Sequence, residues 1–291
     1  MPTSRPSRRG FLAGVALLAS GCAAPAVVTA RSPGLDELVA RLSAYADRDQ
    51  PYRPPRPDER DGLLAGLQPL RDGRPPAPDV ARFGMDPVAG TDASTGKRWV
   101  GAVSRTGDER AWGAVLAGAD EPSSMLVEVP HIKADLHTED LGLAVFRARP
   151  GALLLIAGAH RDADSGRADV AHHADSLFHA IAAAWGGAGL PQLQLHGFSD
   201  DSLPGHDAVV SPGGSAPGPL LTRVSAALAT AAGLGVCRAD EQDCGALEGR
   251  TNEQGRAAAA AHTEFVHVEL NRTTRDDARL RQRVADALAA A

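Results

Sequence analysis

The sequence predicts an α/β domain in which helices cover both faces of a mixed, largely parallel central sheet. Three observations lead to this fold class. Short apolar runs of strand length recur from residue 125 onward, they alternate with amphipathic stretches of helical spacing, and the chain contains no internal repeat. Strands that are buried on both faces are apolar by default, so any polar residue that ends such a strand is a candidate for function.

Five apolar runs are the expected strands of the sheet. They are MLVEVP (125–130), ALLLIAGA (152–159), PQLQLH (191–196), DAVVS (207–211) and FVHVEL (265–270). Upstream of them, RWVGAV (98–103) and AWGAVLA (111–117) flank the turn residues 106–108. These two runs are therefore predicted to form a hairpin.

Four stretches have the spacing of helices. The first lies within 31–46, the second spans roughly 167–186, the third begins at Pro219, and the last carries Leu280, Val284 and Leu288 on one side. Between the first helix and the hairpin, RDQPYRPPRPDER (48–60) is proline-rich and charged, which predicts a linker or surface loop.

The amino-terminal residues are typical of an export signal. The motif Ser7-Arg8-Arg9-Gly10-Phe11-Leu12 is a twin-arginine signature, and the apolar run that follows it is too short to span a bilayer. The segment ends at Cys22, in a context similar to a lipobox, so we expect lipidation of Cys22 and anchoring on the outer face of the cell membrane. The alternative is ordinary cleavage after Ala26 or Ala30.

These features divide the chain into three parts. Residues 1–30 are the signal and tether, residues 31–124 are an amino-terminal helix, linker and hairpin packed on the main domain, and residues 125–291 are the α/β core. The net charge of −6, with no basic stripe, argues against a nucleic-acid partner. Of the three cysteines, Cys237 and Cys244 remain once Cys22 is lipidated, and an exported protein favours a disulfide between them.

Polar side chains stand at the ends of four predicted strands. His131 follows the first, His160 and Arg161 follow the second, His196 ends the third, and Glu269 lies near the end of the fifth. Sites in open α/β sheets gather at the carboxyl ends of strands, so these residues are expected to meet.

The chemistry that these residues favour is a hydrolytic zinc site. Such a site needs about three nitrogen or oxygen ligands, an open position for water, and a nearby carboxylate that accepts a proton. We predict that His131, Asp135 and His196 bind zinc and that Glu269 is the general base. Glu139 is an alternative to Asp135, although a carboxylate in the first turn of a helix is also favoured without a metal.

The other histidines have more ordinary interpretations. His137 is expected to face solvent, and His267 shares a strand face with Glu269, where it either packs in the core or supports the glutamate. A polar helix face is the preferred interpretation for His172, His173 and His179.

Taken together, these motifs resemble a known superfamily. PHxxxDxxTE, GAHR, LHG, and VEL followed by arginines resemble the zinc carboxypeptidase-like hydrolases, with poly-γ-glutamate hydrolases of the phage type and N-formylglutamate amidohydrolases as the nearest branches. The resemblance covers roughly residues 125–290. It implies a carboxypeptidase/phosphorylase-hydrolase-like sheet and the same zinc ligands and base as above. This sequence departs from the family's pattern at the second ligand. It has Asp four residues after the histidine, where better-known members have Glu at other spacings.

The resemblance also implies a kind of substrate. Relatives cleave amides that lie beside carboxylates, so arginines become candidates to bind a substrate carboxylate. The candidate substrate-binding residues are Arg161, His160, Asn252 and Arg275, with Arg272 as a further candidate. The expected protein is thus an exported, lipid-anchored zinc amidohydrolase or peptidase acting on a peptide, γ-glutamyl or N-acyl amino-acid amide. The alternative is a non-catalytic surface lipoprotein that binds peptides or cell-wall fragments.

Overall fold

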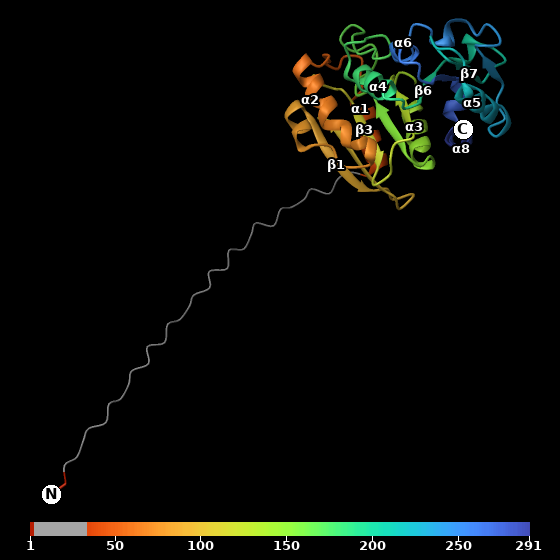
Figure 1. Ribbon diagram of the computed structural model, residues 1–291. Coiled ribbons are helices and arrows are strands. Elements are labelled where there is room, and N and C mark those ends of the chain that lie inside the picture. Colours follow the sequence, from red (N-terminus) through yellow and green to blue (C-terminus); the bar gives the residue numbers. More distant parts are fainter. Residues whose placement is uncertain (3–33) are drawn as a thin grey trace. The chain divides into compact units, whose positions relative to one another are not determined.

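A nine-stranded sheet dominates the computed structural model, which describes residues 1–2 and 34–291 (Figure 1). The expected lipidation site, Cys22, lies outside the described residues. The strands are β1 (Met85–Thr91), β2 (Arg98–Ser104), β3 (Ala114–Gly118), β4 (Met125–Val129), β5 (Ala152–Ile156), β6 (Gln192–Gly197), β7 (Ala208–Ser211), β8 (Val236–Arg238) and β9 (Phe265–Leu270). Their order across the sheet is β1-β2-β3-β5-β4-β6-β9-β7-β8.

The sheet is mixed, as the sequence predicts, and its four central strands form its largest parallel part. Strands β5, β4, β6 and β9 run parallel to one another. The β1-β2-β3 ribbon joins β5 in antiparallel fashion, and β7 is antiparallel to β9 and parallel to β8. The carboxyl ends of four adjacent strands therefore lie along one edge.

The segment before residue 125 belongs to this sheet. The predicted hairpin is confirmed as β2 and β3, and β3 pairs with β5 from Ala114↔Ile156 to Ala117↔Leu153. The expected boundary near residue 124 therefore falls between strands of one sheet, and residues 34–291 lie within one compact unit. Strand β1, the three-residue strand β8 and the helix that begins at Pro57, inside the expected linker, were not predicted.

Helices lie against both faces of the sheet. They are α1 (Leu35–Tyr45), α2 (Pro57–Leu67), α3 (Thr138–Ala148), α4 (Leu177–Gly187), α5 (Pro219–Thr230), α6 (Glu253–Ala260), α7 (Arg272–Asp276) and α8 (Ala278–Ala290). Side chains of α1, α3, α5 and α8 share a core with Val127 and Leu154, whereas α2 and α4 share a second core with Leu126 and Leu153. Successive strand residues thus point to opposite faces.

The helix predicted over 167–186 is shorter than expected. Residues 161–176 form a series of turns, and α4 begins only at Leu177. Its N-cap is Ser176, whose hydroxyl accepts a hydrogen bond from the His179 backbone N–H at 3.1 Å. The prediction was wrong because Val170 and Ala174 continue the apolar spacing by chance through a Gly- and Asp-rich loop. The correction matters, because this loop reaches the candidate site.

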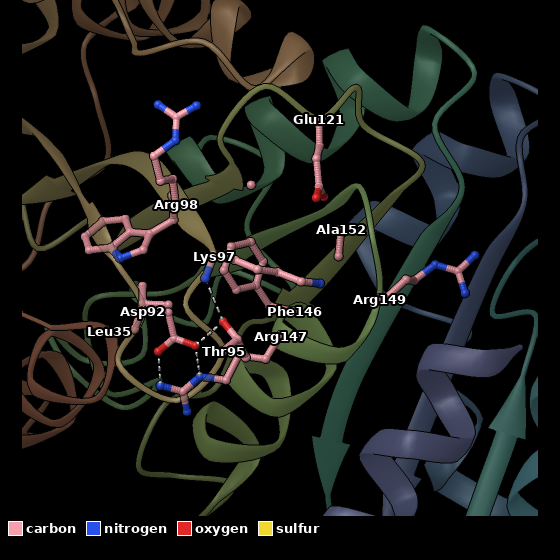
Figure 2. Close-up of a pocket in the computed structure, with 12 residues that line it drawn as sticks. Leu35, Asp92, Thr95, Lys97, Arg98, Glu121, Phe146, Arg147, Arg149 and Ala152 are labelled. Atoms are coloured by element: carbon pink, nitrogen blue, oxygen red, sulfur yellow. Dashed lines mark hydrogen bonds and ion pairs between the residues drawn. The ribbon is translucent and has the colours of Figure 1, made fainter.

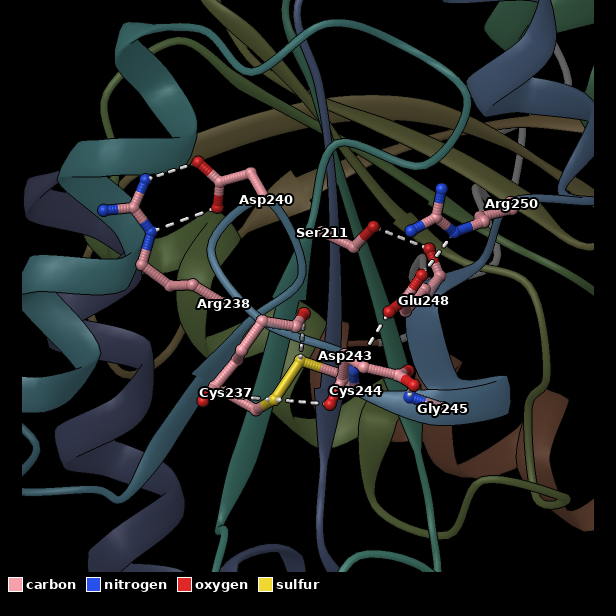
Figure 3. The surroundings of a disulfide bond; sticks show 10 residues. Ser211, Cys237, Arg238, Asp240, Asp243, Cys244, Gly245, Glu248 and Arg250 are labelled. Atoms are coloured by element: carbon pink, nitrogen blue, oxygen red, sulfur yellow. Dashed lines mark hydrogen bonds and ion pairs between the residues drawn. A yellow bond between two sulfur atoms is a disulfide. The ribbon is translucent and has the colours of Figure 1, made fainter.

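The predicted pairing of Cys237 and Cys244 is present as a disulfide (Figure 3). Both cysteines are buried, and the Cys244 backbone N–H donates to Glu248 Oε1 at 2.9 Å. The Glu248 carbonyl accepts from the Ser211 hydroxyl at 2.6 Å, so the segment that follows the disulfide is fixed to β7. Among the residues that the structure describes, no helix is long and apolar enough to cross a bilayer.

Candidate metal centre

Three adjacent strands bring the predicted site residues together. Strand β4 leads directly into Pro130 and His131, while His196 lies in β6 and Glu269 in β9. In the register between β6 and β9, His196 stands directly opposite Glu269. Because β4, β6 and β9 are parallel neighbours, residues 65 and more positions apart in sequence reach the same edge of the sheet.

A tight turn after β4 adds Asp135. The Asp135 backbone N–H donates to the His131 carbonyl at 2.9 Å, which closes one helical turn between the two residues. The Asp135 carbonyl then accepts from the backbone N–H and the hydroxyl of Thr138, at 3.1 and 2.8 Å, where α3 begins. The strand end and the helix start therefore hold the His131 and Asp135 side chains on the same side of the turn.

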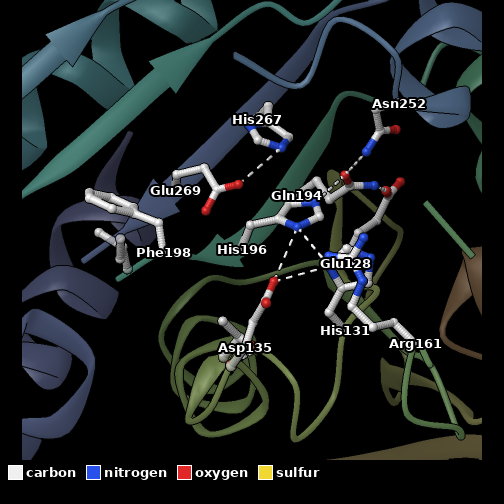
Figure 4. Close-up of polar contacts among 12 residues, drawn as sticks. Glu128, His131, Asp135, Arg161, Gln194, His196, Phe198, Asn252, His267 and Glu269 are labelled. Carbon is white, nitrogen blue, oxygen red and sulfur yellow. Dashed lines mark hydrogen bonds and ion pairs between the residues drawn. The ribbon is translucent and has the colours of Figure 1, made fainter. Parts of the chain in front are cut away.

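The facing atoms of His131, Asp135 and His196 form a nearly regular triangle (Figure 4). His131 Nδ1 lies 3.1 Å from Asp135 Oδ2 and 3.2 Å from His196 Nδ1, and His196 Nδ1 lies 3.3 Å from Asp135 Oδ2. Ligands about 2.0–2.1 Å from a tetrahedral zinc ion are separated from one another by about 3.3 Å. Two imidazole nitrogens and one carboxylate oxygen are also a common zinc donor set. The residues present therefore fit a zinc ion.

Each histidine uses its second ring nitrogen to bind a neighbour. His131 Nε2 lies 2.9 Å from Asp169 Oδ1, and His196 Nε2 lies 2.7 Å from Gln194 Oε1. Histidines that bind metals usually donate their other N–H to a carboxylate or carbonyl oxygen, which fixes the ring and its tautomer. Both rings consequently present Nδ1 to the centre of the triangle.

Charge is concentrated around these atoms. Burial by itself would lower the pKa of His131, but hydrogen bonds to Asp135 and Asp169 outweigh it and raise that pKa to about 9. Burial would raise the pKa of Asp135, yet its hydrogen bonds with His131 and His196 hold it well below the usual value. The raised pKa of His131 favours its protonated form beside the Asp135 carboxylate. A metal ion that binds His131 Nδ1 would have to displace the proton from that nitrogen.

Glu269 lies beside the triangle without belonging to it. His196, His267 and Glu269 offer atoms within 4.8 Å of one another, and Glu269 Oε1 lies 3.8 Å from His267 Nε2. Burial, together with the negative charge of Asp135, raises the pKa of Glu269 well above its usual value. Among the described residues, Glu269 Oε2 has no hydrogen-bond partner. This carboxyl group is therefore available to a molecule in the site.

A cavity of about 640 Å³ opens onto these side chains. His131, Asp135, His196 and Glu269 line its floor, and residues 245–252, which follow the disulfide, form a wall. The remaining lining residues are Arg161, His172, Gly197, Phe198, Ser202 and His267. A volume of this size accommodates a small peptide or an acylated amino acid.

The structure distinguishes between the two acidic candidates. Asp135 faces both histidines, whereas Glu139 accepts a hydrogen bond from the Ser43 hydroxyl at 2.7 Å and does not line the cavity. Burial raises the pKa of Glu139. Glu139 therefore joins α3 to α1, and Asp135 is the residue placed to bind a metal.

Two of the expected substrate-binding residues are placed elsewhere. Arg275 is buried and donates to the backbone carbonyls of Leu136, Phe198 and Leu270 at 2.6–3.0 Å, so its guanidinium tethers the loops around the site. A Cβ at Gly197 would lie 2.2 Å from that guanidinium, which explains the glycine. His160 is also buried but does not line the cavity.

Of the other candidate residues, two line the cavity and one does not. Arg161 lines the cavity, ion-pairs with Asp169, and places Nη1 3.3 Å from His131 Nδ1. Asn252 lines the cavity too, but its side chain caps α6 by accepting from the Gln254 and Gly255 backbone N–H groups. Arg272 donates to Asp276 at 2.7 Å and is not a lining residue.

The histidines expected to be bystanders mostly are. His137 is half exposed and pairs with Asp140 at 2.9 Å. His173 does not line the cavity, and His179 lies on α4. His172 differs from the prediction of a polar helix face: it lies in the turns before α4, and its Nδ1 is 3.0 Å from Asp169 Oδ1.

Asp169 and Gln194 are the partners of the site that the sequence did not predict. Asp169 falls within the stretch predicted to be helical, although its surroundings, DADSGRAD (162–169), contain the Gly and Asp residues that favour turns. Gln194 lies two residues before His196 on the same strand face. A glutamine inside a predicted buried strand was the sequence feature that could have indicated a partner for His196.

A second, much smaller hollow lies at the opposite ends of the strands (Figure 2). It measures about 30 Å³ and is lined by residues at the beginnings of β2 and β5. Arg147 there is already engaged, by Asp36 at 2.7 Å and by Asp92 at 2.8 Å. These contacts join α1 and α3 to the sheet, and none of the candidate ligands takes part.

Buried polar groups continue from the site into the sheet. Glu128, in β4, is opposite Gln194 in the strand register, and its Oε2 accepts from Gln194 Nε2 at 2.7 Å. Burial raises the pKa of Glu128 to about 8, and the hydrogen bond from Gln194 only partly opposes this shift.

Glu128 is expected to make the folded chain less stable as the pH rises. The unfolded carboxyl loses its proton near pH 4.5, whereas the folded one keeps it until about pH 8, so stability declines between these values. The shift corresponds to about 5 kcal/mol. Glu128→Gln should remove this contribution, so urea unfolding in a chelator should show the variant gaining stability relative to wild type between pH 5 and pH 8. An equal gain in the exposed-residue control Glu37→Gln would contradict the assignment.

Comparisons with known proteins leave the family open. No protein-family model matches the chain, and no curated protein matches it. Two solved structures described as candidate metallopeptidases are similar to it, each at 14% identity over 73% of this chain. One, from Shewanella denitrificans OS217, has a TM-score of 0.35 with 84% of its chain covered; the other, from Shewanella amazonensis SB2B, has 0.34 with 86% covered. TM-scores this low do not establish a shared fold, so the function has to follow from the geometry of the site.

Proposed function

We propose that this protein is a zinc-dependent hydrolase that cleaves an amide bond in a peptide, a γ-glutamyl compound or an N-acyl amino acid. The observation that carries the proposal is the triangle of His131 Nδ1, Asp135 Oδ2 and His196 Nδ1, with edges of 3.1–3.3 Å. These edges match a tetrahedral zinc site, and the triangle faces a cavity lined by Glu269, whose Oε2 has no hydrogen-bond partner among the residues that the structure describes.

Glu269 is suited to the role of general base. A zinc ion bound by the three ligands would polarise the amide carbonyl and lower the pKa of a neighbouring water molecule. The positive charge would also oppose the burial that raises the pKa of Glu269 and would favour its carboxylate form. Glu269 would then accept a proton from the attacking water and return it to the leaving nitrogen.

Arg161 supplies a positive charge at the cavity wall. Its ion pair with Asp169 fixes the guanidinium, and Asp169 in turn holds His131, so the three side chains form one unit. The Arg161 side chain lines the cavity and is still 36% exposed, so a bound molecule can reach it. A planar guanidinium in this position suits an anionic group of the substrate.

The place of action in this proposal is outside the cytoplasm. The twin-arginine signature at residues 7–12 and the lipobox-like context of Cys22 support export followed by lipid anchoring. The disulfide between Cys237 and Cys244 is compatible with an oxidising compartment.

Hydrolysis of a defined panel tests the proposed activity. The purified protein, loaded with zinc, would be assayed on N-acyl amino acids, γ-glutamyl peptides and muropeptides, with a chelator-treated sample as the control. We expect turnover of at least one class that disappears on chelation and returns with zinc. Turnover that survives complete removal of metal would contradict the proposal.

A further inference from the structure

A chain of buried amides leads from the backbone to the metal ligand His196. Gln194 lies at its centre, and both of its amide atoms are engaged (Figure 4). Gln194 Nε2 lies 2.7 Å from Glu128 Oε2 and 3.2 Å from Gln254 Oε1. Gln194 Oε1 faces Asn252 Nδ2 and lies 2.7 Å from His196 Nε2.

Backbone contacts of two residues, Gln254 and Asn252, determine the direction of the hydrogen bonds among these buried amides. Gln254 Nε2 donates to the Val170 carbonyl at 2.8 Å, so the Gln254 atom that faces Gln194 is the acceptor Oε1. Asn252 Oδ1 accepts from the backbone N–H groups of Gln254 and Gly255 at 2.9 and 3.2 Å, so the Asn252 atom that faces Gln194 is the donor Nδ2. A backbone carbonyl can only accept and a backbone N–H can only donate, and neither contact can be reversed.

The orientation of Gln194 follows from these two neighbours. Its Nε2 must face Gln254 and Glu128, and its Oε1 must face Asn252 and His196. An oxygen that faces His196 Nε2 requires a proton on that nitrogen, which leaves His196 Nδ1 with a free lone pair. That lone pair points at His131 and Asp135, at 3.2 and 3.3 Å.

From this geometry we propose that Gln194 is a positioning residue that holds His196 in the Nε2–H tautomer and so prepares its Nδ1 to bind the metal. The inference rests on the metal site of the proposed function and adds a residue outside the ligand set. It also explains why a glutamine occupies a fully buried strand position. Its Nε2 has two acceptors and its Oε1 has two donors as neighbours, so its hydrogen-bonding capacity is satisfied.

The same strand provides a matched control. Gln192 precedes Gln194 by two residues, shares its face, and is equally buried, but among the described residues neither Nε2 nor Oε1 of its side chain has a hydrogen-bond partner. Replacing Gln192 by methionine therefore changes a buried glutamine of the same strand without touching His196.

Zinc affinity, measured by competition with a chromophoric chelator, tests the inference. Gln194→Met should weaken zinc binding about 10–100-fold, the range found when a partner of a ligating histidine is removed. Gln192→Met should bind zinc as wild type does. Equal affinity in Gln194→Met and wild type would overturn this inference alone, whereas a wild-type protein that binds no zinc would overturn the metal site as well.

A measurement on the wild-type protein covers the case in which Gln194→Met does not fold. Long-range ¹H–¹⁵N correlation spectra of the metal-free protein, labelled with ¹⁵N-histidine, report which ring nitrogen carries the proton. The set of signals that is present in the wild-type spectrum and missing from the spectrum of His196→Gln belongs to His196. We expect the Nε2–H tautomer at His196, and a proton on Nδ1 instead would overturn the inference.

Discussion

Glu269→Gln is expected to abolish hydrolysis while leaving zinc binding unchanged. The amide keeps the size of the carboxyl group but cannot accept the proton of the attacking water, and loss of a general base commonly lowers the rate by about 10²–10⁴-fold. Because Glu269 lies outside the ligand triangle, zinc per chain should stay at the wild-type value. Kinetics on the best substrate of the panel, together with metal analysis of the same sample, provide both readouts.

The control for this variant is Glu139→Gln, which changes a buried glutamate away from the cavity. It should affect stability through the contact with Ser43 and leave the chemical step unchanged. Full activity in Glu269→Gln would remove Glu269 from the mechanism. Loss of zinc in Glu269→Gln would instead make Glu269 a ligand.

His196→Ala is expected to have the largest effect on metal binding. It removes one of three ligands, and even the loss of a partner of a ligating histidine weakens binding 10–100-fold, so we expect a decrease beyond about a hundredfold. Activity should fall with the metal. Competition with a chelator measures the affinity, and circular dichroism of the metal-free protein shows whether the fold is retained.

The matched control for His196→Ala is His173→Ala, in the turns before α4 and away from the cavity lining. Zinc affinity in this variant should equal that of wild type. If His196→Ala retains wild-type affinity, the three atoms of the triangle do not form the site.

The parallel centre of the sheet was predictable because β5 is a continuous apolar run and β4, β6 and β9 are short runs in which leucine, valine or phenylalanine recurs. Strand ends are also visible in such runs, which is why His131, His196 and Glu269 could be selected without coordinates. The edges were harder: β1 contains Pro87 and has only one buried residue, Met85, and β8 has only three residues. Pro57 was read as a loop residue, although proline is well tolerated in the first turn of a helix.

Within the site, the choice of ligand required three-dimensional information. Asp135 and Glu139 both follow the end of β4 closely in sequence. Only the turn that closes between His131 and Asp135 shows which of the two carboxylates faces the histidines. The role of Arg275 was not accessible from sequence either, because its guanidinium donates to three backbone carbonyls that are far apart in sequence, those of Leu136, Phe198 and Leu270. Asp169 was missed for a local reason, since a helix was extended through turn residues.

Crystallographic anomalous scattering at the zinc edge tests the central claim most directly. Crystals of the protein purified without a chelating tag should give one strong peak about 2.0–2.2 Å from His131 Nδ1, Asp135 and His196 Nδ1, and this peak should disappear in His196→Ala. A zinc-supplied crystal with no peak among these three side chains, or with its only peak elsewhere, would contradict the account.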